Sequence, residues 1–271
     1  MNLHEYAYLS KLAYRLDDHE SENQWRRRLF YALSRHGFAL VSTFDRLDTQ
    51  GFIARRGTDI VIAFRGTEVA RGEDVRTDLS IWPRRDRIGH AHSGISIALD
   101  HVWLTIHAHL ASLESVPGAT IHLTGHSLGG MLAKLAAVRL LRSHNVGSLV
   151  TFGAPPVLSR FPSKMLSRML APKCIRVQSA DAVTMTLRLL YRSAGTRTYI
   201  DRKGRVIERA GCYVALLDRL AIVSAETRRR LGSLCRGNFR DAFARSKFAT
   251  NHSINRYLKS LEPNPPHASA S

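Results

Sequence analysis

The chain has 271 residues, 44% of them hydrophobic, so it can bury a sizeable core, and its composition is neither that of a disordered nor of a fibrous protein. It carries 40 Lys or Arg against 22 Asp or Glu, a formal net charge of +18, which favours anionic partners such as acidic membranes or nucleic acid. Residues 182–260 contribute 17 of the basic residues and only 5 of the acidic ones. A solvated surface of a basic protein explains the same charge equally well.

The first 20 residues show no basic stretch followed by an apolar run, so we expect neither a signal peptide nor a transit peptide. No stretch approaches the roughly 18–20 consecutive apolar residues of a membrane-spanning helix. We therefore expect a soluble protein, either cytoplasmic or exported without a cleaved signal. Cys174, Cys212 and Cys235 are an odd number without CxxC spacing, which predicts neither a disulfide framework nor a zinc site.

Helical and strand-like patterns alternate along the chain. Helices are expected over 3–16, about 22–35, about 93–113, 128–144 and the basic stretch 213–247. Strands are expected over 38–44, 51–57, 59–67, 119–124, 147–155 and 174–181, with a hairpin over 198–208 that turns at Lys203-Gly204. Strand–helix–strand connections of this length imply parallel pairing with right-handed crossovers. The sequence therefore predicts an α/β fold, a mostly parallel central sheet with helices on both faces, in one domain over 1–262 with a disordered tail over 263–271.

The segment TGHSLGG places Ser127 between a predicted strand and a predicted helix. The pattern Gly-x-Ser-x-Gly indicates a nucleophile only in that setting, because the sharp turn then exposes the serine at the carboxyl edge of the sheet. Gly125 and Gly129 keep side-chain atoms out of the turn. The first helix amides, including that of Leu128, point to where an oxyanion would form. We predict that Ser127 is a nucleophile; a purely structural turn is the alternative.

A serine nucleophile needs a base, and the base needs an orienting carboxylate. Three histidines follow Ser127 in the sequence, His144, His252 and His267, and only His252 stands on a loop just before a helical run. The acidic candidates between the two are Asp181, Asp201, Glu208, Asp218, Glu226 and Asp241. Asp181 alone directly follows a predicted core strand. We predict a Ser127–Asp181–His252 triad; the alternatives are an Asp181 that caps the following segment and a structural His252.

The apolar run over 59–64 ends in Arg65-Gly66-Thr67. This ending would place a backbone amide and a hydroxyl at the carboxyl edge of a neighbouring strand, where both could donate to an oxyanion. Taken alone, the same tripeptide is an ordinary turn.

Together these segments resemble the class 3 lipases, the fungal-triglyceride-lipase-like branch of the α/β-hydrolases. The similar segments, in chain order, are YAYLSKLAY, VIAFRGT, TDLSIWP, HSGI, GHSLGG, TFGAPPV, RVQSADAV and NHSINRYL. The resemblance implies an α/β-hydrolase fold and hydrolysis of lipid carboxylic esters with no metal or organic cofactor. It implies Ser127 as nucleophile, Asp181 and His252 as its partners, and Thr67 with Leu128 as oxyanion donors. The chain departs from the family at NHS, where an acidic residue often precedes the histidine, and at PPVLS, where the family pattern is PxVG.

Residues 68–92 lie where class 3 lipases carry a lid, and Val75, Leu79 and Trp82 fall at i, i+4 and i+7. We expect this stripe to cover the acyl groove; an amphipathic helix packed on the core is the alternative. The basic region 182–260 favours anionic phospholipid as substrate, hence a phospholipase A type, over a neutral-lipid lipase or a short-chain esterase. The rival from another class is a non-catalytic lipase-like protein whose basic face binds anionic membranes or nucleic acid. That rival predicts a missing catalytic residue, whereas a candidate for each catalytic role is present in the sequence. No recognisable nucleic-acid module is present either.

Overall fold

The computed structural model describes residues 1–17, 19–47, 49–66, 82–87, 89–113, 116–179, 187–201, 203–210 and 252–263. Its helices are α1 (Leu3–Leu12), α2 (Glu22–Ser34), α3 (Ser93–Leu113), α4 (Leu128–Leu140), α5 (Arg160–Met169) and α9 (Ile254–Leu261). Its strands are β1 (Ala39–Arg46), β2 (Thr49–Arg56), β3 (Asp59–Phe64), β4 (Pro83–Asp86), β5 (Gly89–His92), β6 (Thr120–His126), β7 (Val146–Phe152), β8 (Cys174–Ser179), β9 (Thr196–Ile200) and β10 (Val206–Ile207).

Eight strands form one sheet in the order β1-β2-β3-β6-β7-β8-β9-β10. Strands β3, β6, β7, β8 and β9 pair in parallel, whereas β1, β2 and β10 pair antiparallel at the two edges. The predicted mostly parallel sheet is therefore confirmed. Because its central strands are parallel, their carboxyl ends meet at one edge, which is where β3 leads to Gly66 and β6 leads to Ser127.

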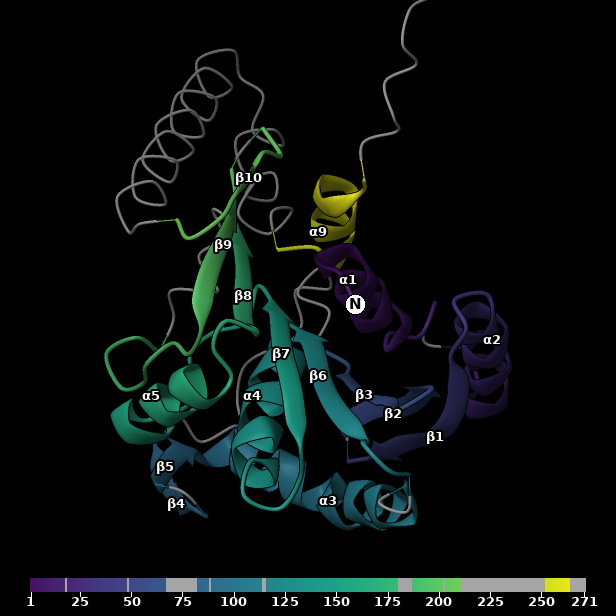
Figure 1. The fold of residues 1–271 in the computed structure, drawn as a ribbon, viewed down its shortest axis with the longest axis horizontal. Helices are drawn as coiled ribbons and strands as arrows, with labels where there is room; N and C mark the ends of the chain where they lie inside the picture. Colours follow the sequence, from purple (N-terminus) through teal and green to yellow (C-terminus); the bar gives the residue numbers. More distant parts are fainter. Residues whose placement is uncertain are drawn as a thin grey trace, which may run out of the picture.

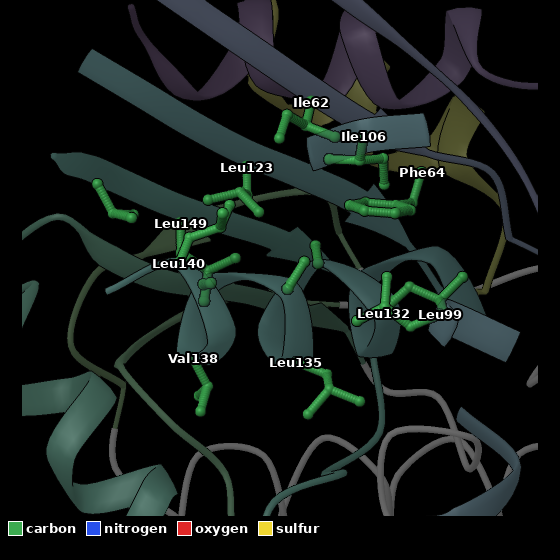
Figure 2. Packing of buried hydrophobic residues seen from close by; sticks show 14 of the residues in the cluster. Ile62, Phe64, Leu99, Ile106, Leu123, Leu132, Leu135, Val138, Leu140 and Leu149 are labelled. Carbon is green, nitrogen blue, oxygen red and sulfur yellow. The ribbon is translucent and has the colours of Figure 1, made fainter. Parts of the chain in front are cut away.

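Helices cover both faces of the sheet (Figure 1). Side chains alternate along β3, so that Ile60, Ile62 and Phe64 pack under α3 and α4 while Val61 and Ala63 pack under α1 and α2. Figure 2 shows the first of these layers, where side chains from β3, β6 and β7 meet those of α3 and α4. Helix α9 lies beside α1 on the opposite face (Figure 1), over β7 and β8. The core is thus two apolar layers separated by the sheet.

Helix α1 meets β6 through a row of buried polar contacts. The Tyr6 hydroxyl reaches Ser148 Oγ at 2.5 Å and His122 Nδ1 at 3.2 Å. One turn later Ser10 Oγ lies 2.8 Å from Thr124 Oγ1, and Tyr14 Oη lies 2.7 Å from His126 Nδ1. The spacing matches because four helical residues rise about 6 Å and two strand residues advance about 6.6 Å. We call these contacts the α1–β6 polar row.

The segment that follows the undescribed residues 67–81 is tied to the body of the protein. Strands β4 and β5 form a two-stranded antiparallel hairpin, and Asp86 of β4 pairs with Arg139 of α4 at 2.6 Å. Both side chains are about 5% exposed. Burial alone would raise the pKa of Asp86, but hydrogen bonds from Arg139 and Ser96 hold that pKa below its usual value. This ion pair fixes the hairpin against α4.

Most predicted elements lie where the sequence places them, including α3 and the hairpin that turns at Lys203-Gly204. Helices α1 and α4 end earlier than predicted, at Leu12 and Leu140, and turns follow both. Helix α5 and the β4–β5 hairpin were not predicted. The predicted helix 213–247 and most of the predicted tail lie outside the described residues. Within the part of the chain that the structure describes, no helix has the length and apolar character that crossing a membrane requires.

Replacement of Arg139 by Met is expected to lower the free energy of unfolding by about 3–5 kcal/mol, because Asp86 is left as an uncompensated buried charge. The matched double variant Arg139→Met with Asp86→Leu removes both charges and is expected to recover most of that loss. Urea unfolding of the three proteins measures the difference. A double variant as unstable as the single one would contradict the view that the unpaired carboxylate is the cause.

Candidate active site

Ser127 occupies a strained turn between β6 and α4. Its φ of 54° and ψ of −123° fall in a region that residues with side chains rarely adopt. The turn is held by hydrogen bonds from the Ser127 amide to the Phe152 carbonyl (2.9 Å) and from the Gly130 amide to the Ser127 carbonyl (3.0 Å). The side chain makes no capping bond to α4. The strain therefore serves to project the hydroxyl from the carboxyl end of β6.

Glycines let three backbone segments meet at this turn. A Cβ atom on Gly125 would overlap the backbone of Gly129, and one on Gly129 would overlap the carbonyl of Phe64. A Cβ atom on Gly66 would overlap the carbonyl of His126. The end of β3 is therefore packed directly on the turn that carries Ser127, as the predicted oxyanion arrangement requires.

His252 faces Ser127 from the segment that precedes α9. Its Nε2 lies 2.7 Å from Ser127 Oγ, and the two residues are 2% and 5% exposed. The imidazole lies against Gly153, where a Cβ atom would stand 3.2 Å from His252 Cε1. On α9, the Tyr257 hydroxyl lies 3.2 Å from Ser179 Oγ at the end of β8. Helix α9 thus brings the histidine to the edge where β6, β7 and β8 end.

The structure brings three of the five predicted site residues together: Ser127, His252 and Leu128, whose amide is the first of α4. The other two, Thr67 and Asp181, lie outside the described residues. Their neighbours are described, since Thr67 directly follows Gly66 and Asp181 comes two residues after Ser179. Among the described residues, no group of three or more His, Cys, Asp or Glu side chains could hold a metal ion.

His126, which precedes the serine, connects His252 to the α1–β6 polar row. Its Nε2 bonds to the backbone carbonyl of His252, which can only accept, so the proton is on Nε2. Burial and the nearby His252 lower the pKa of His126 to about 3, so the ring is neutral and its Nδ1 accepts from the Tyr14 hydroxyl. A directed chain therefore runs from Tyr14 through His126 to the backbone of His252. Sequence reasoning missed this chain, although Tyr14 and His126 stand at polar positions of otherwise apolar segments.

Lys134 was also missed. It lies on α4 and is 2% exposed, and its Nζ donates to the carbonyls of Ala154 (3.2 Å) and Pro155 (3.0 Å). Burial lowers the pKa of Lys134 to about 7. The lysine holds the loop that begins at Gly153, against which His252 packs. A lysine inside the alanine-rich run LAKLAAV was the sequence signal that could have revealed this role.

The family model described as lipase (class 3) matches residues 61–189. The matched residues include the β3 ending, the turn at Ser127 and Asp181. This segment is therefore similar to the class 3 lipases. Among curated proteins, none matches the chain.

Solved lipase structures have a similar fold over about three quarters of this chain. The triacylglyceride lipase of Rhizomucor miehei has a TM-score of 0.61 at 22% identity, covering 75% of this chain and 81% of that one. The lipase of Rhizopus microsporus var. chinensis has a TM-score of 0.58 at 24% identity, covering 73% of each chain. The Lip2 lipase of Yarrowia lipolytica, nonglycosylated, has a TM-score of 0.60 at 20% identity, covering 73% of this chain and 78% of that one. The matched segment thus lies within an α/β-hydrolase fold, as the sequence predicted.

The low pKa of His126 predicts a loss of stability in mild acid. In the unfolded chain this histidine has a pKa of about 6.5, so below that pH the unfolded state binds a proton that the folded state, with its pKa of about 3, does not. Stability is therefore lost as pH falls below about 6.5, by about 2 kcal/mol between pH 7 and pH 5. In His126→Gln, whose amide can donate and accept like the ring, this loss is expected to shrink by that amount. Urea unfolding at both pH values tests it; equal losses in the two proteins would contradict the assignment.

Removal of the Tyr14 hydroxyl is expected to affect catalysis as well as stability. In Tyr14→Phe the buried Nδ1 of His126 loses its donor, so the bond that positions His252 weakens and kcat on a dissolved ester falls about tenfold at unchanged KM. The matched control is Tyr6→Phe, which removes the hydroxyl at the other end of the same row. It is expected to cost about 1–2 kcal/mol of stability and to leave kcat unchanged. If both variants lose stability alike and both keep kcat, Tyr14 has no positioning role.

Proposed function

We propose that the protein hydrolyses carboxylic esters of lipids through an acyl-enzyme, with Ser127 as nucleophile and His252 as base. The single observation that carries the proposal is the 2.7 Å contact between His252 Nε2 and the oxygen of a serine held at positive φ. If His252 had only a structural role, the facing residue would not have to be a serine at positive φ, because any small residue fits an ordinary turn. The class 3 lipase match supports lipid esters as the substrate class.

In the proposed reaction, Ser127 attacks the ester carbonyl while His252 Nε2 takes the hydroxyl proton. Asp181, two residues beyond the end of β8, holds the proton of His252 on Nδ1 and stabilises the imidazolium. The amides of Thr67 and Leu128 donate to the oxyanion of the tetrahedral intermediate. Protonated His252 then delivers its proton to the leaving alcohol. Water attacks the acyl-enzyme in the same way, with His252 again as base, and releases the carboxylic acid and free Ser127.

A phospholipid substrate, cleaved in the manner of a phospholipase A, is the finer part of the proposal. It is supported by the net charge of +18, since an anionic lipid surface attracts such a protein and concentrates it near its substrate. Triglyceride and short-chain esters fit the same chemistry and are the alternatives. A non-catalytic lipid-binding or nucleic-acid-binding role is less well supported, because the contact between Ser127 and His252 has no purpose in it.

The proposed lid includes only the part of the expected segment 68–92 that precedes residue 83. Val75 and Leu79 of the expected stripe lie outside the described residues, and Trp82 is 69% exposed. The second part of the expected segment 68–92 is the β4–β5 hairpin, which the Asp86–Arg139 ion pair fixes to α4. We therefore restrict the proposed lid to 68–82, with 1–262 as one catalytic domain.

Ser127→Ala tests the chemistry. The variant is expected to lose ester hydrolysis by about 10⁴-fold or more, because no other group can form the acyl-enzyme. Fatty-acid release is measured on a dissolved short-chain ester, a triglyceride emulsion, and zwitterionic and anionic phospholipid vesicles. Serine-dependent release that is fastest on anionic vesicles supports a phospholipase, and faster release from aggregated than from dissolved substrate supports a lid.

The control for this experiment is Ser112→Ala, which changes an exposed serine of α3 and is expected to keep full activity. Hydrolysis that survives in Ser127→Ala, or wild-type protein inactive on all four substrates, would overturn the proposed function.

A further inference from the structure

The outward face of α5 carries only basic and large apolar side chains. Its exposed residues are Arg160, Phe161, Lys164, Arg168 and Met169. The helix contains no acidic residue, and none of its three cations is in an ion pair with a described residue. An ordinary solvated helix face mixes both signs of charge, so this composition indicates a partner.

A groove of about 530 Å³ runs between α5 and the segment that leads into β9. Four of its lining residues are basic, Arg160, Lys164, Arg168 and Arg192, and the remaining four are serines and an alanine. No acidic side chain is among the residues that line it. Four like charges around one groove repel each other, and a bound anion would relieve that repulsion. The groove therefore suits phosphate-bearing ligands.

Exposed apolar side chains surround these cations. Phe161 is 68% exposed, Met169 is 56% exposed, and Leu189, three residues before Arg192, is 96% exposed. Cations next to exposed apolar side chains are typical of surfaces that lie on anionic bilayers, where the cations meet headgroups and the apolar groups enter the acyl boundary. Nucleic-acid phosphates would use the cations but would leave Met169 and Leu189 without a role.

We propose that this surface, formed by the exposed residues of α5 together with Leu189 and Arg192 and called here the α5 surface, docks the protein on anionic phospholipid bilayers. This docking role extends the proposed function and rests on it in one respect: a lipid hydrolase needs a surface that brings it to its substrate. It places most of the membrane contact before the basic region 182–260 that the sequence favoured, and only Leu189 and Arg192 fall within that region.

Vesicle co-sedimentation tests the proposal in a Ser127→Ala background, which leaves the lipid intact. The vesicles are phosphatidylcholine with and without phosphatidylglycerol. The triple variant Arg160→Gln, Lys164→Gln, Arg168→Gln is expected to bind the anionic vesicles about 100-fold more weakly, since each basic residue near an anionic surface contributes roughly a factor of five. Binding of the parent protein is expected to weaken as salt is added.

The matched control removes three charges elsewhere. Arg26, Arg27 and Arg35 lie exposed on or next to α2, at the other end of the molecule from α5 (Figure 1), on a helix that also exposes Glu22, Phe30 and Tyr31. Their triple change to Gln is expected to weaken anionic-vesicle binding less than about fivefold, because these cations stay outside the screening distance of the bilayer. Equal losses in the two triple variants would show that binding follows net charge alone and would overturn the proposal.

Phe161→Ser tests the apolar part of the surface. It is expected to weaken vesicle binding about tenfold while leaving the dependence on salt unchanged. Unchanged vesicle binding in the α5 triple variant would overturn the proposal. So would a triple variant that binds an oligonucleotide more weakly than the parent protein but binds anionic vesicles equally well. The α5 triple change in the active protein is expected to keep hydrolysis of a dissolved ester. Failure of the proposed function shows as no hydrolysis by wild type, whatever the vesicle result.

Discussion

Strand β6 lies in the middle of the sheet, yet the side chains that it turns toward α1 are polar. His122, Thr124 and His126 occupy alternate positions there, and each is buried or nearly so. Leaving such groups unpaired would cost about 1–3 kcal/mol each, so α1 and the turn that follows it must supply a hydroxyl at every fourth residue. This requirement fixes both the position of α1 along the strand and its rotation about its own axis. The α1–β6 polar row is therefore the constraint that sets the N-terminal helix relative to the centre of the sheet.

The two ends of this row differ in what they fix. At one end His122 donates from Nε2 to Asp59 at 3.0 Å and accepts from Ser148 at 2.7 Å, contacts that hold β3, β6 and β7 together. At the other end His126 donates to the backbone of His252. The histidine proposed as the base has to move little while its charge changes. The bond from His126 anchors the backbone of His252 and leaves both ring nitrogens to Ser127 and to Asp181 in the proposed reaction.

The sequence was informative where function depends on local backbone geometry. Gly125, Ser127 and Gly129 predict the turn because only small residues fit its backbone contacts, and the helical spacing of apolar residues over 3–16 predicts a helix there. The chain from Tyr14 to His252 was beyond prediction, because it joins residues more than a hundred positions apart through a backbone carbonyl. Helix α5 escaped notice because Pro162 and its short, strongly basic sequence obscure the helical pattern. Asp181 and Thr67 rest on sequence reasoning alone.

The positive charge of the protein divides into two kinds once the fold is known. Arg139 and Lys134 are buried on α4, where one pairs with Asp86 and the other binds backbone carbonyls, so neither is available to a partner. The cations of α5 lie at the surface without an ion-pair partner among the described residues. They stand beside apolar side chains that are exposed to water. Net charge alone treats both kinds alike, which is why it favoured an anionic partner without locating it. Burial separates them, because a buried cation stabilises the fold only when it is satisfied internally, whereas an exposed unpaired one is stabilised by whatever anion approaches it.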